Sequence, residues 1–148
     1  MITGLVATPL KVFRDQRGSV MHMLRSDSPL FSGFGEVYFS TIGHRVVKAW
    51  RRNQFATANF AVPMGSVELV AFDDREESST RASKLCITLN SEQYQLVTIP
   101  PRVWYGFIGL AHDESLIVNV LDRPYDTHAT ERREYPSTEI PHTWDQVS

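Results

Sequence analysis

Short strand-like runs recur about every ten residues along most of the chain, and this spacing limits the folds open to it. Ten such runs cover residues 5–13, 19–25, 36–42, 46–50, 55–63, 67–73, 84–89, 95–99, 103–110 and 115–121. Turn residues separate them, among them Gly18, Gly65 and the Pro100-Pro101 pair. Many short strands with this punctuation predict an all-β sandwich or closed barrel rather than βαβ units.

The length and composition predict one domain spanning residues 1–148. Hydrophobic residues make up 42% of the 148 positions and charged residues 22%, which is ordinary for a soluble globular protein. A chain of this size buries roughly two-thirds of the surface that its unfolded form exposes, so a single core is expected.

The charge balance argues against nucleic-acid and membrane partners. The net charge of -2 leaves no basic footprint for nucleic acid or for an anionic membrane surface. The amino terminus lacks the pattern of a signal peptide, which predicts a cytoplasmic protein. The single Cys86 excludes an intrachain disulfide, fits a reducing compartment and is expected to be a buried structural thiol.

Two segments fall outside the strand pattern. A turn is expected at residues 26–30, where Asp27-Ser28-Pro29 provides a start signal for a short helix. After Leu121 the pattern gives way to a polar tail, which we expect to wrap the barrel or a partner subunit through Trp144.

Two polar and aromatic runs look like the two halves of a cupin site. The first is VVKAWRRNQ at residues 46–54 and the second is IPPRVWYGF at residues 99–107. In many cupins these halves carry three imidazoles, whereas Arg51, Asn53 and Tyr105 stand here. The resemblance implies a cupin jelly-roll barrel in which the two runs are adjacent strands facing one cavity.

No metal or other cofactor is expected. Arg51, Asn53 and Tyr105 cannot supply the neutral imidazole ligands of Zn, Fe or Ni sites. The five histidines show no metal-ligand spacing.

Five motifs in order resemble the dTDP-4-dehydrorhamnose 3,5-epimerase family over nearly the whole chain. They are FRDQRG at 13–18, KAW at 48–50, FDDR at 72–75 with Ser79-Thr80, the run at 99–107, and DRPYD at 122–126. The resemblance implies an isomerase that removes and returns a proton beside the ketone of a nucleotide-linked 4-keto-6-deoxy sugar.

The resemblance also assigns catalytic positions. The position of the family's His base is Arg51, that of its Lys is Asn59, and that of its Tyr acid is Tyr125. A guanidinium stays protonated near neutral pH, so Arg51 can stabilise an enolate or bind phosphate but cannot readily accept a proton. Tyr105 is a possible surrogate base, provided that Arg51 or Lys48 lowers its pKa.

Substrate binding is assigned on the same resemblance to a set of polar residues, namely Arg17, Lys48, Asn53, Asn59, Asp73, Arg75 and Tyr38. Each has a structural alternative. Arg17 is equally expected as a solvated turn residue, and Asp73 with Arg75 as a surface ion pair. Because side chains alternate along a strand, only one of Arg51 and Arg52 can face the barrel interior.

Three functions stay open at this point: an epimerase of nucleotide-linked sugars, a cupin that binds nucleotide sugars or other carbohydrates without turnover, and a metal-dependent cupin enzyme. The first is preferred, with a nucleotide sugar as ligand. A homodimer is also predicted, because the apolar run at residues 5–10 is suited to crossing onto a neighbour.

Overall fold

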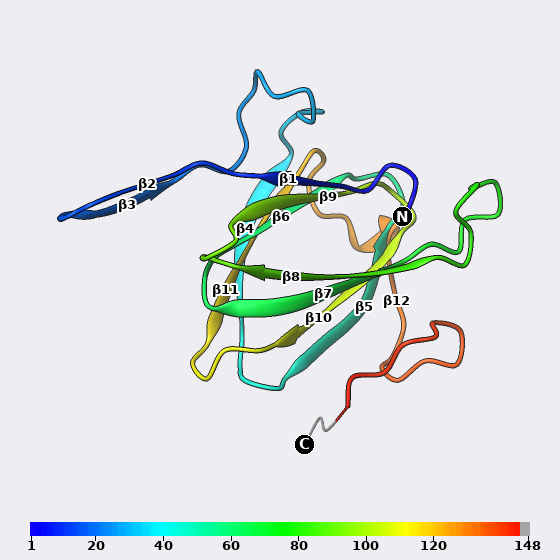
Figure 1. Ribbon diagram of the computed structural model, residues 1–148. Helices are drawn as coiled ribbons and strands as arrows, with labels where there is room; N and C mark the ends of the chain where they lie inside the picture. The colour runs from blue at the N-terminus through cyan, green and yellow to red at the C-terminus, as the bar shows by residue number, and fades with distance from the viewer. Residues whose placement is uncertain (146–148) are drawn as a thin grey trace.

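The computed structural model describes residues 1–145 and is an all-β barrel of the jelly-roll type (Figure 1). Its strands are β1 (Val6–Pro9), β2 (Val12–Asp15), β3 (Gly18–Met21), β4 (Glu36–Ile42), β5 (Val47–Asn53), β6 (Ala58–Met64), β7 (Ser66–Phe72), β8 (Lys84–Asn90), β9 (Gln95–Ile99), β10 (Trp104–Gly109), β11 (Ser115–Leu121) and β12 (Thr130–Arg132). The predicted all-β jelly roll is confirmed. Residues 146–148, the end of the predicted domain, lie outside the described part.

Two antiparallel five-stranded sheets form the barrel. One has the order β1-β9-β6-β11-β4 and the other β12-β5-β10-β7-β8. Alternate side chains on each strand point between the sheets, as on β6, where Ala58, Phe60 and Val62 are buried in the main core. The described residues contain no helix long and apolar enough to cross a membrane.

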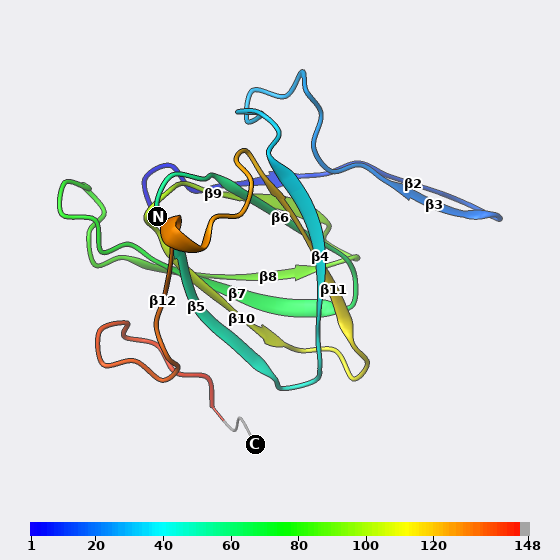
Figure 2. The ribbon, with the colours of Figure 1, turned by 180° about the vertical axis from the view of Figure 1, so that it is seen from behind.

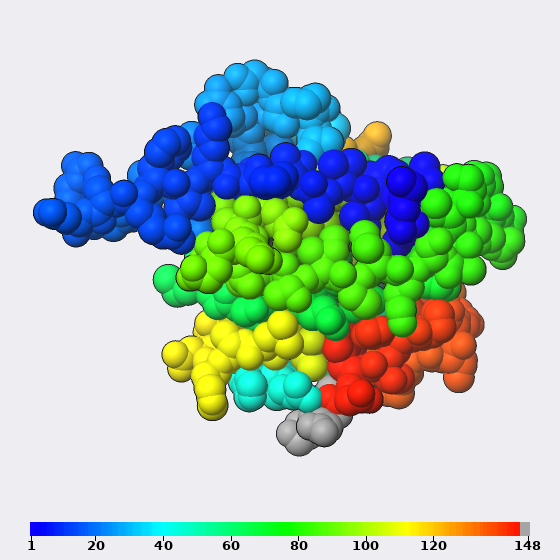
Figure 3. Space-filling view, in the orientation of Figure 1, coloured from blue at the N-terminus to red at the C-terminus, as the bar shows by residue number. Residues whose placement is uncertain are grey.

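The amino-terminal segment leaves the barrel. The run predicted as one strand at residues 5–13 is divided into β1, which pairs with β9, and β2, which pairs only with β3. The β2–β3 hairpin projects from the barrel in the ribbon and in the space-filling view (Figures 1 and 3). Phe13 and Val20 face each other across this hairpin and are 58% and 61% exposed.

The carboxy-terminal tail returns to the barrel through β12, which lies beside β5 (Figure 2). Trp144 then stacks on Trp50 with ring centroids 5.3 Å apart, and its indole N–H donates to Glu68 at 2.7 Å. Together with Trp104 and Ile140 these indoles form a second buried cluster. The prediction that the tail wraps the barrel through Trp144 is confirmed within one chain.

Two local expectations need correction. Residues 26–30 form a turn without a helix, and the one helical turn in the described part is the 3-10 helix Thr127–Ala129. Cys86 is exposed rather than buried, because Leu85, Ile87 and Leu89 on edge strand β8 take the inward positions and leave Cys86 on the outer face.

The pairing of β5 with β10 brings the two predicted motif halves together, as expected. Its register is irregular: Tyr105 pairs with Arg51 but Gly106 pairs with Ala49, so Trp50 has no partner on β10. The backbones approach closely here. A Cβ added to Gly106 would lie 2.5 Å from the Ala49 Cβ and 2.9 Å from the Trp50 ring, so only glycine fits.

We therefore expect Gly106→Ala to destabilise the fold by overpacking, by about 1–3 kcal/mol. The control is Gly43→Ala, whose added Cβ meets nothing nearer than a Val46 methyl at 3.4 Å. Chemical denaturation of the three proteins measures the difference. Equal unfolding free energies for wild type and Gly106→Ala would contradict the close packing at this irregularity.

Candidate active site

A cavity of about 590 Å³ lies between the inner faces of the two sheets. This volume is in the range of small-molecule sites. The lining comes from six strands and from the two residues after β12, and it consists of Tyr38, Ser40, Lys48, Ala49, Trp50, Arg51, Phe60, Tyr105, Phe107, Ile117, Arg132, Arg133 and Glu134. Four residues predicted for the site therefore meet here: Tyr38, Lys48, Arg51 and Tyr105.

The irregular pairing of β5 explains why Lys48 and Arg51 both face this cavity. Residues three apart on a regular strand point to opposite faces. Lys48 pairs with Phe107 and Arg51 with Tyr105, because the unpaired Trp50 acts as the extra residue of a bulge. Both cations consequently share the inner face. The expectation that only one arginine of the doublet points inward is also met, since Arg52 stacks on Trp104 at 4.5 Å and pairs with Asp74 at 2.7 Å.

Uncharged polar groups lie deeper in the barrel. Asn119 is fully buried, and its amide N–H donates to the Tyr38 hydroxyl at 2.9 Å. Within the described residues, the Asn119 Oδ1 and the Tyr105 hydroxyl are buried without a hydrogen-bond partner. Unpaired buried polar atoms are costly, and a polar ligand that entered the cavity could pair with the hydroxyl of Tyr105, which lines it.

The idea that neighbouring cations lower the pKa of Tyr105 is wrong. Burial, together with the nearby Tyr38, raises the pKa of this phenol well above its usual range, and the opposing effect of Arg51 and Asn53 is smaller. Tyr105 therefore remains a neutral hydrogen-bond donor near neutral pH. A phenol that stays protonated cannot act as the surrogate base that the sequence suggested.

Tyr125 contacts the cavity wall without lining it. Its hydroxyl accepts a hydrogen bond from Arg132 at 3.2 Å, and the Arg51 guanidinium lies 5.9 Å from its ring centroid. Its ring and the buried Asn53 line a second hollow of about 480 Å³ at the end of β5. Tyr125 is 38% exposed, so solvent reaches it.

Two predicted ligands lie away from the cavity of their own chain. Arg17 is at the tip of the β2–β3 hairpin, 90% exposed and paired with Asp15 at 2.6 Å. Asn59 is buried next to Phe60 on β6, but on the opposite face of the strand, where it accepts a hydrogen bond from Thr98 at 2.7 Å.

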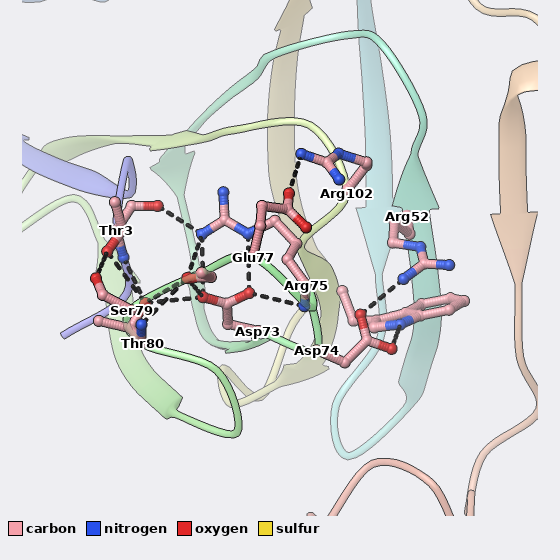
Figure 4. Close-up of polar contacts among 11 residues, drawn as sticks. Thr3, Arg52, Asp73, Asp74, Arg75, Glu77, Ser79, Thr80 and Arg102 are labelled. Carbon is pink, nitrogen blue, oxygen red and sulfur yellow. Dashed lines mark hydrogen bonds and ion pairs between the residues drawn. The ribbon is translucent and has the colours of Figure 1, made fainter.

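Asp73 and Arg75 form a closed structural network (Figure 4). The fully buried Asp73 carboxylate accepts hydrogen bonds from Arg75 Nε at 2.8 Å, Ser78 at 2.6 Å and Thr80 at 2.8 Å. Arg75 also donates to the Thr3 carbonyl at 2.7 Å and so ties the amino terminus to this loop. The pair is neither on the cavity wall nor at the surface, and its donors are used within the chain.

The sequence reasoning missed the lining residues at the end of β12 and directly after it. Arg132, Arg133 and Glu134 lie in the charged run ERRE, which was included only in the polar tail. β12 has only three residues, which is too short for alternation of polar and apolar residues to reveal a strand. The charged run itself was the one available signal. Over residues 1–145, no group of three or more His, Cys, Asp or Glu side chains is placed to hold a metal ion.

Comparison with known proteins agrees with this architecture. The family model described as dTDP-4-dehydrorhamnose 3,5-epimerase matches residues 1–148. The chain belongs to this family. A curated member, the probable low-salt glycan biosynthesis epimerase Agl13 of Haloferax volcanii, is 31% identical over 129 residues, which cover 86% of this chain and 83% of that protein.

Solved structures of the epimerase family have the same fold. The dTDP sugar isomerase of Desulfovibrio desulfuricans G20 superposes with a TM-score of 0.95 at 39% identity and covers 99% of this chain and 94% of that one. ChmJ, a 3'-monoepimerase of Streptomyces bikiniensis solved with dTDP-quinovose, has a TM-score of 0.88 at 15% identity and covers 99% and 78%.

The Asp73 network generates a prediction about stability. Burial alone would raise the pKa of Asp73, but hydrogen bonds from Arg75, Ser78 and Thr80 outweigh it and hold this pKa well below its usual value. The resulting stabilisation is fully present above the unfolded-state pKa of about 3.9 and is lost as the pH falls below it. We expect Asp73→Asn to lower the unfolding free energy at pH 7 by about 3–5 kcal/mol.

Denaturation at pH 7 and at several pH values below 4 measures both effects. Asp73→Asn should also show a weaker loss of stability with acid than the wild type. The exposed turn residue Asp113 provides the control, and Asp113→Asn should behave as wild type. A variant at Asp73 that kept the stability and acid response of the wild type would show that the network is not structural.

Proposed function

We propose that the protein is an epimerase of a dTDP-linked 4-keto-6-deoxy sugar that works by removing and returning a proton beside the ketone. The observation that carries this proposal is the convergence of two strand cations, the buried Tyr105 hydroxyl and the half-buried Tyr38 hydroxyl on one cavity. The family model and the epimerase relatives support it, as does the dTDP-quinovose bound to ChmJ.

The cavity has complementary parts for such a ligand. Lys48, Arg51 and Arg132 supply positive charge for a diphosphate, whose oxygens accept charge-assisted hydrogen bonds. The aromatic rings of Phe60 and Phe107 provide apolar walls. We assign the nucleotide to the cationic side and the sugar to the uncharged polar groups.

The neutral Tyr105 hydroxyl is proposed to stabilise the enolate. Proton removal beside a ketone moves negative charge onto the carbonyl oxygen, and preorganised donors in a dry site lower the free energy of that state. A buried phenol is such a donor because it stays protonated. Arg51 adds a fixed positive charge, and we assign the return of the proton to Tyr125, whose ring lies 5.9 Å from the Arg51 guanidinium and which solvent reaches.

A carbohydrate-binding protein without turnover is the less favoured function. Binding a diphosphate requires only the cations. The buried hydroxyl of Tyr105, unpaired in the described part of the chain, favours a site that stabilises a developing charge.

Solvent-deuterium exchange tests the proposal. Wild-type protein in D₂O should incorporate deuterium into a dTDP-4-keto-6-deoxyhexose beside the ketone, and Tyr105→Phe should slow this exchange by about 10²–10³-fold. Tyr94→Phe is the control, because Tyr94 is also buried but is not part of the cavity wall. Absence of exchange with wild type, while the same nucleotide sugar binds, would favour binding without turnover.

A homodimer is also proposed. Phe13 and Val20 on the hairpin, and Val37 and Phe39 on the outer face of β4, are between 43% and 65% exposed, and a second copy would cover such apolar side chains. The hairpin carries Arg17 away from its own barrel, so a binding role for Arg17 requires the cavity of a neighbour. We place the reaction in the cytoplasm, which suits the exposed, unpaired Cys86.

Light scattering tests the assembly. Wild type should have twice the mass of one chain, which is 16.9 kDa. Phe13→Asp should shift the measured mass toward that of a single chain. The control Leu110→Asp changes an apolar residue that is 38% exposed on the turn after β10. A monomeric wild type at micromolar concentration would overturn the dimer.

A further inference from the structure

The proposed reaction needs a proton acceptor, and the residues considered so far do not provide one. Arg51, at the family's base position, is a permanent cation, and so are its neighbours Lys48 and Arg132 near neutral pH. Tyr38 and Tyr105 carry phenols, and burial keeps that of Tyr105 protonated. A carboxylate, by contrast, is ionised near neutral pH and accepts a proton.

Glu134 is the one carboxylate among the residues that line the main cavity in the described part of the chain. We infer that Glu134 is the general base that removes the proton beside the ketone of the substrate. This inference rests on the epimerase function proposed above. It assigns a residue that lies outside the five sequence motifs, in the segment that follows β12.

Backbone pairing with β5 fixes the place of Glu134. Arg132 pairs with Arg51, and the next residue, Arg133, exchanges two backbone hydrogen bonds with Trp50, of 3.0 and 3.1 Å. Side chains alternate along such a ladder. The Arg133 guanidinium lies over the ring of Trp104 at 4.6 Å, although Arg133 also contributes to the cavity wall, whereas Glu134 has the same parity as Arg132, whose partner Arg51 faces the cavity.

The carboxylates close to Glu134 in sequence are already engaged. Glu131 pairs with Arg52, and Glu139 pairs with Arg133. Glu134 makes no hydrogen bond or ion pair within residues 1–145, so its carboxylate is available to a substrate. Its exposed side chain also allows the proton that it takes to pass to solvent.

The step is balanced with the groups present. The Glu134 carboxylate takes the proton, and the electron pair of the broken C–H bond forms the C=C bond of an enolate. The carbonyl oxygen receives the negative charge and is stabilised by Arg51 and the Tyr105 hydroxyl. Pairing a Glu base with a neutral hydrogen-bond donor is a known solution for proton abstraction beside a carbonyl.

The experiment compares Glu134→Gln with wild type in the solvent-deuterium exchange of a dTDP-4-keto-6-deoxyhexose. Loss of a general base should slow exchange by about 10²–10⁴-fold. Affinity for dTDP, measured by calorimetry, should stay within about twofold, because the amide keeps the size of the side chain while the cations remain.

Two further variants separate a chemical role from a structural one. Glu139→Gln removes a carboxylate of the same segment that does not line the cavity and should exchange at close to the wild-type rate. Glu134→Ala should be partly rescued by added formate, which supplies a small carboxylate. Exchange by Glu134→Gln at the wild-type rate would overturn the assignment and leave the epimerase proposal standing. Absence of exchange in wild type itself would overturn both.

Discussion

The pairing between β5 and β10 is the constraint on which the site depends. A regular antiparallel ladder would place Lys48 and Arg51 on opposite faces of the sheet. The unpaired Trp50 brings both cations to the inner face, and Gly106 allows the two backbones to approach at that point. The same Trp50 is the platform on which the carboxy-terminal tail packs through Trp144. One local irregularity therefore connects the cavity, the outer aromatic cluster and the tail.

The cavity combines two kinds of polarity. Its cations lie on β5, on β12 and directly after β12, whereas the Tyr105 hydroxyl is neutral and buried and the Tyr38 hydroxyl is half-buried. Isolated charges deep in a barrel are expensive to desolvate, while neutral donors cost less and still stabilise a charge that forms during a reaction. This division gives the cavity both positive charge and a neutral hydrogen-bond donor, as the proposed enolate chemistry requires. The proposed base then comes from a different element, Glu134.

The sequence predicted the fold because local and long-range signals agreed. Alternation and turn residues located the strands, and the two motif halves correctly placed Lys48, Arg51 and Tyr105 in one cavity. The predictions failed where they had to say to which face of a strand a particular side chain points. Asn59 was expected to contact the substrate but points away from the cavity, whereas its neighbour Phe60 points into it. Cys86 was misplaced for the same reason on an edge strand.

Other errors came from side-chain partners and burial that residue patterns do not give. The motif Asp73-x-Arg75 looks like a ligand pair, but its partners Ser78, Thr80 and the Thr3 carbonyl become visible only in three dimensions. The pKa of Tyr105 depends on the depth of its burial, which a sequence does not give. Glu134 was overlooked because β12 is too short to show a strand period, and its place in the cavity follows from pairing with β5.

The most direct test of the account is calorimetric titration of dTDP into wild type, Lys48→Ala, Arg51→Ala and Arg81→Ala, each at two salt concentrations. Arg81 lies in an exposed loop away from the cavity, so its variant controls for the loss of one positive charge. We predict that the Lys48 and Arg51 variants bind dTDP at least about tenfold more weakly, as expected for the loss of a charge-assisted contact, and that Arg81→Ala binds as wild type. Equal affinities in all four proteins would show that the cations placed together by the β5 irregularity do not form the nucleotide site.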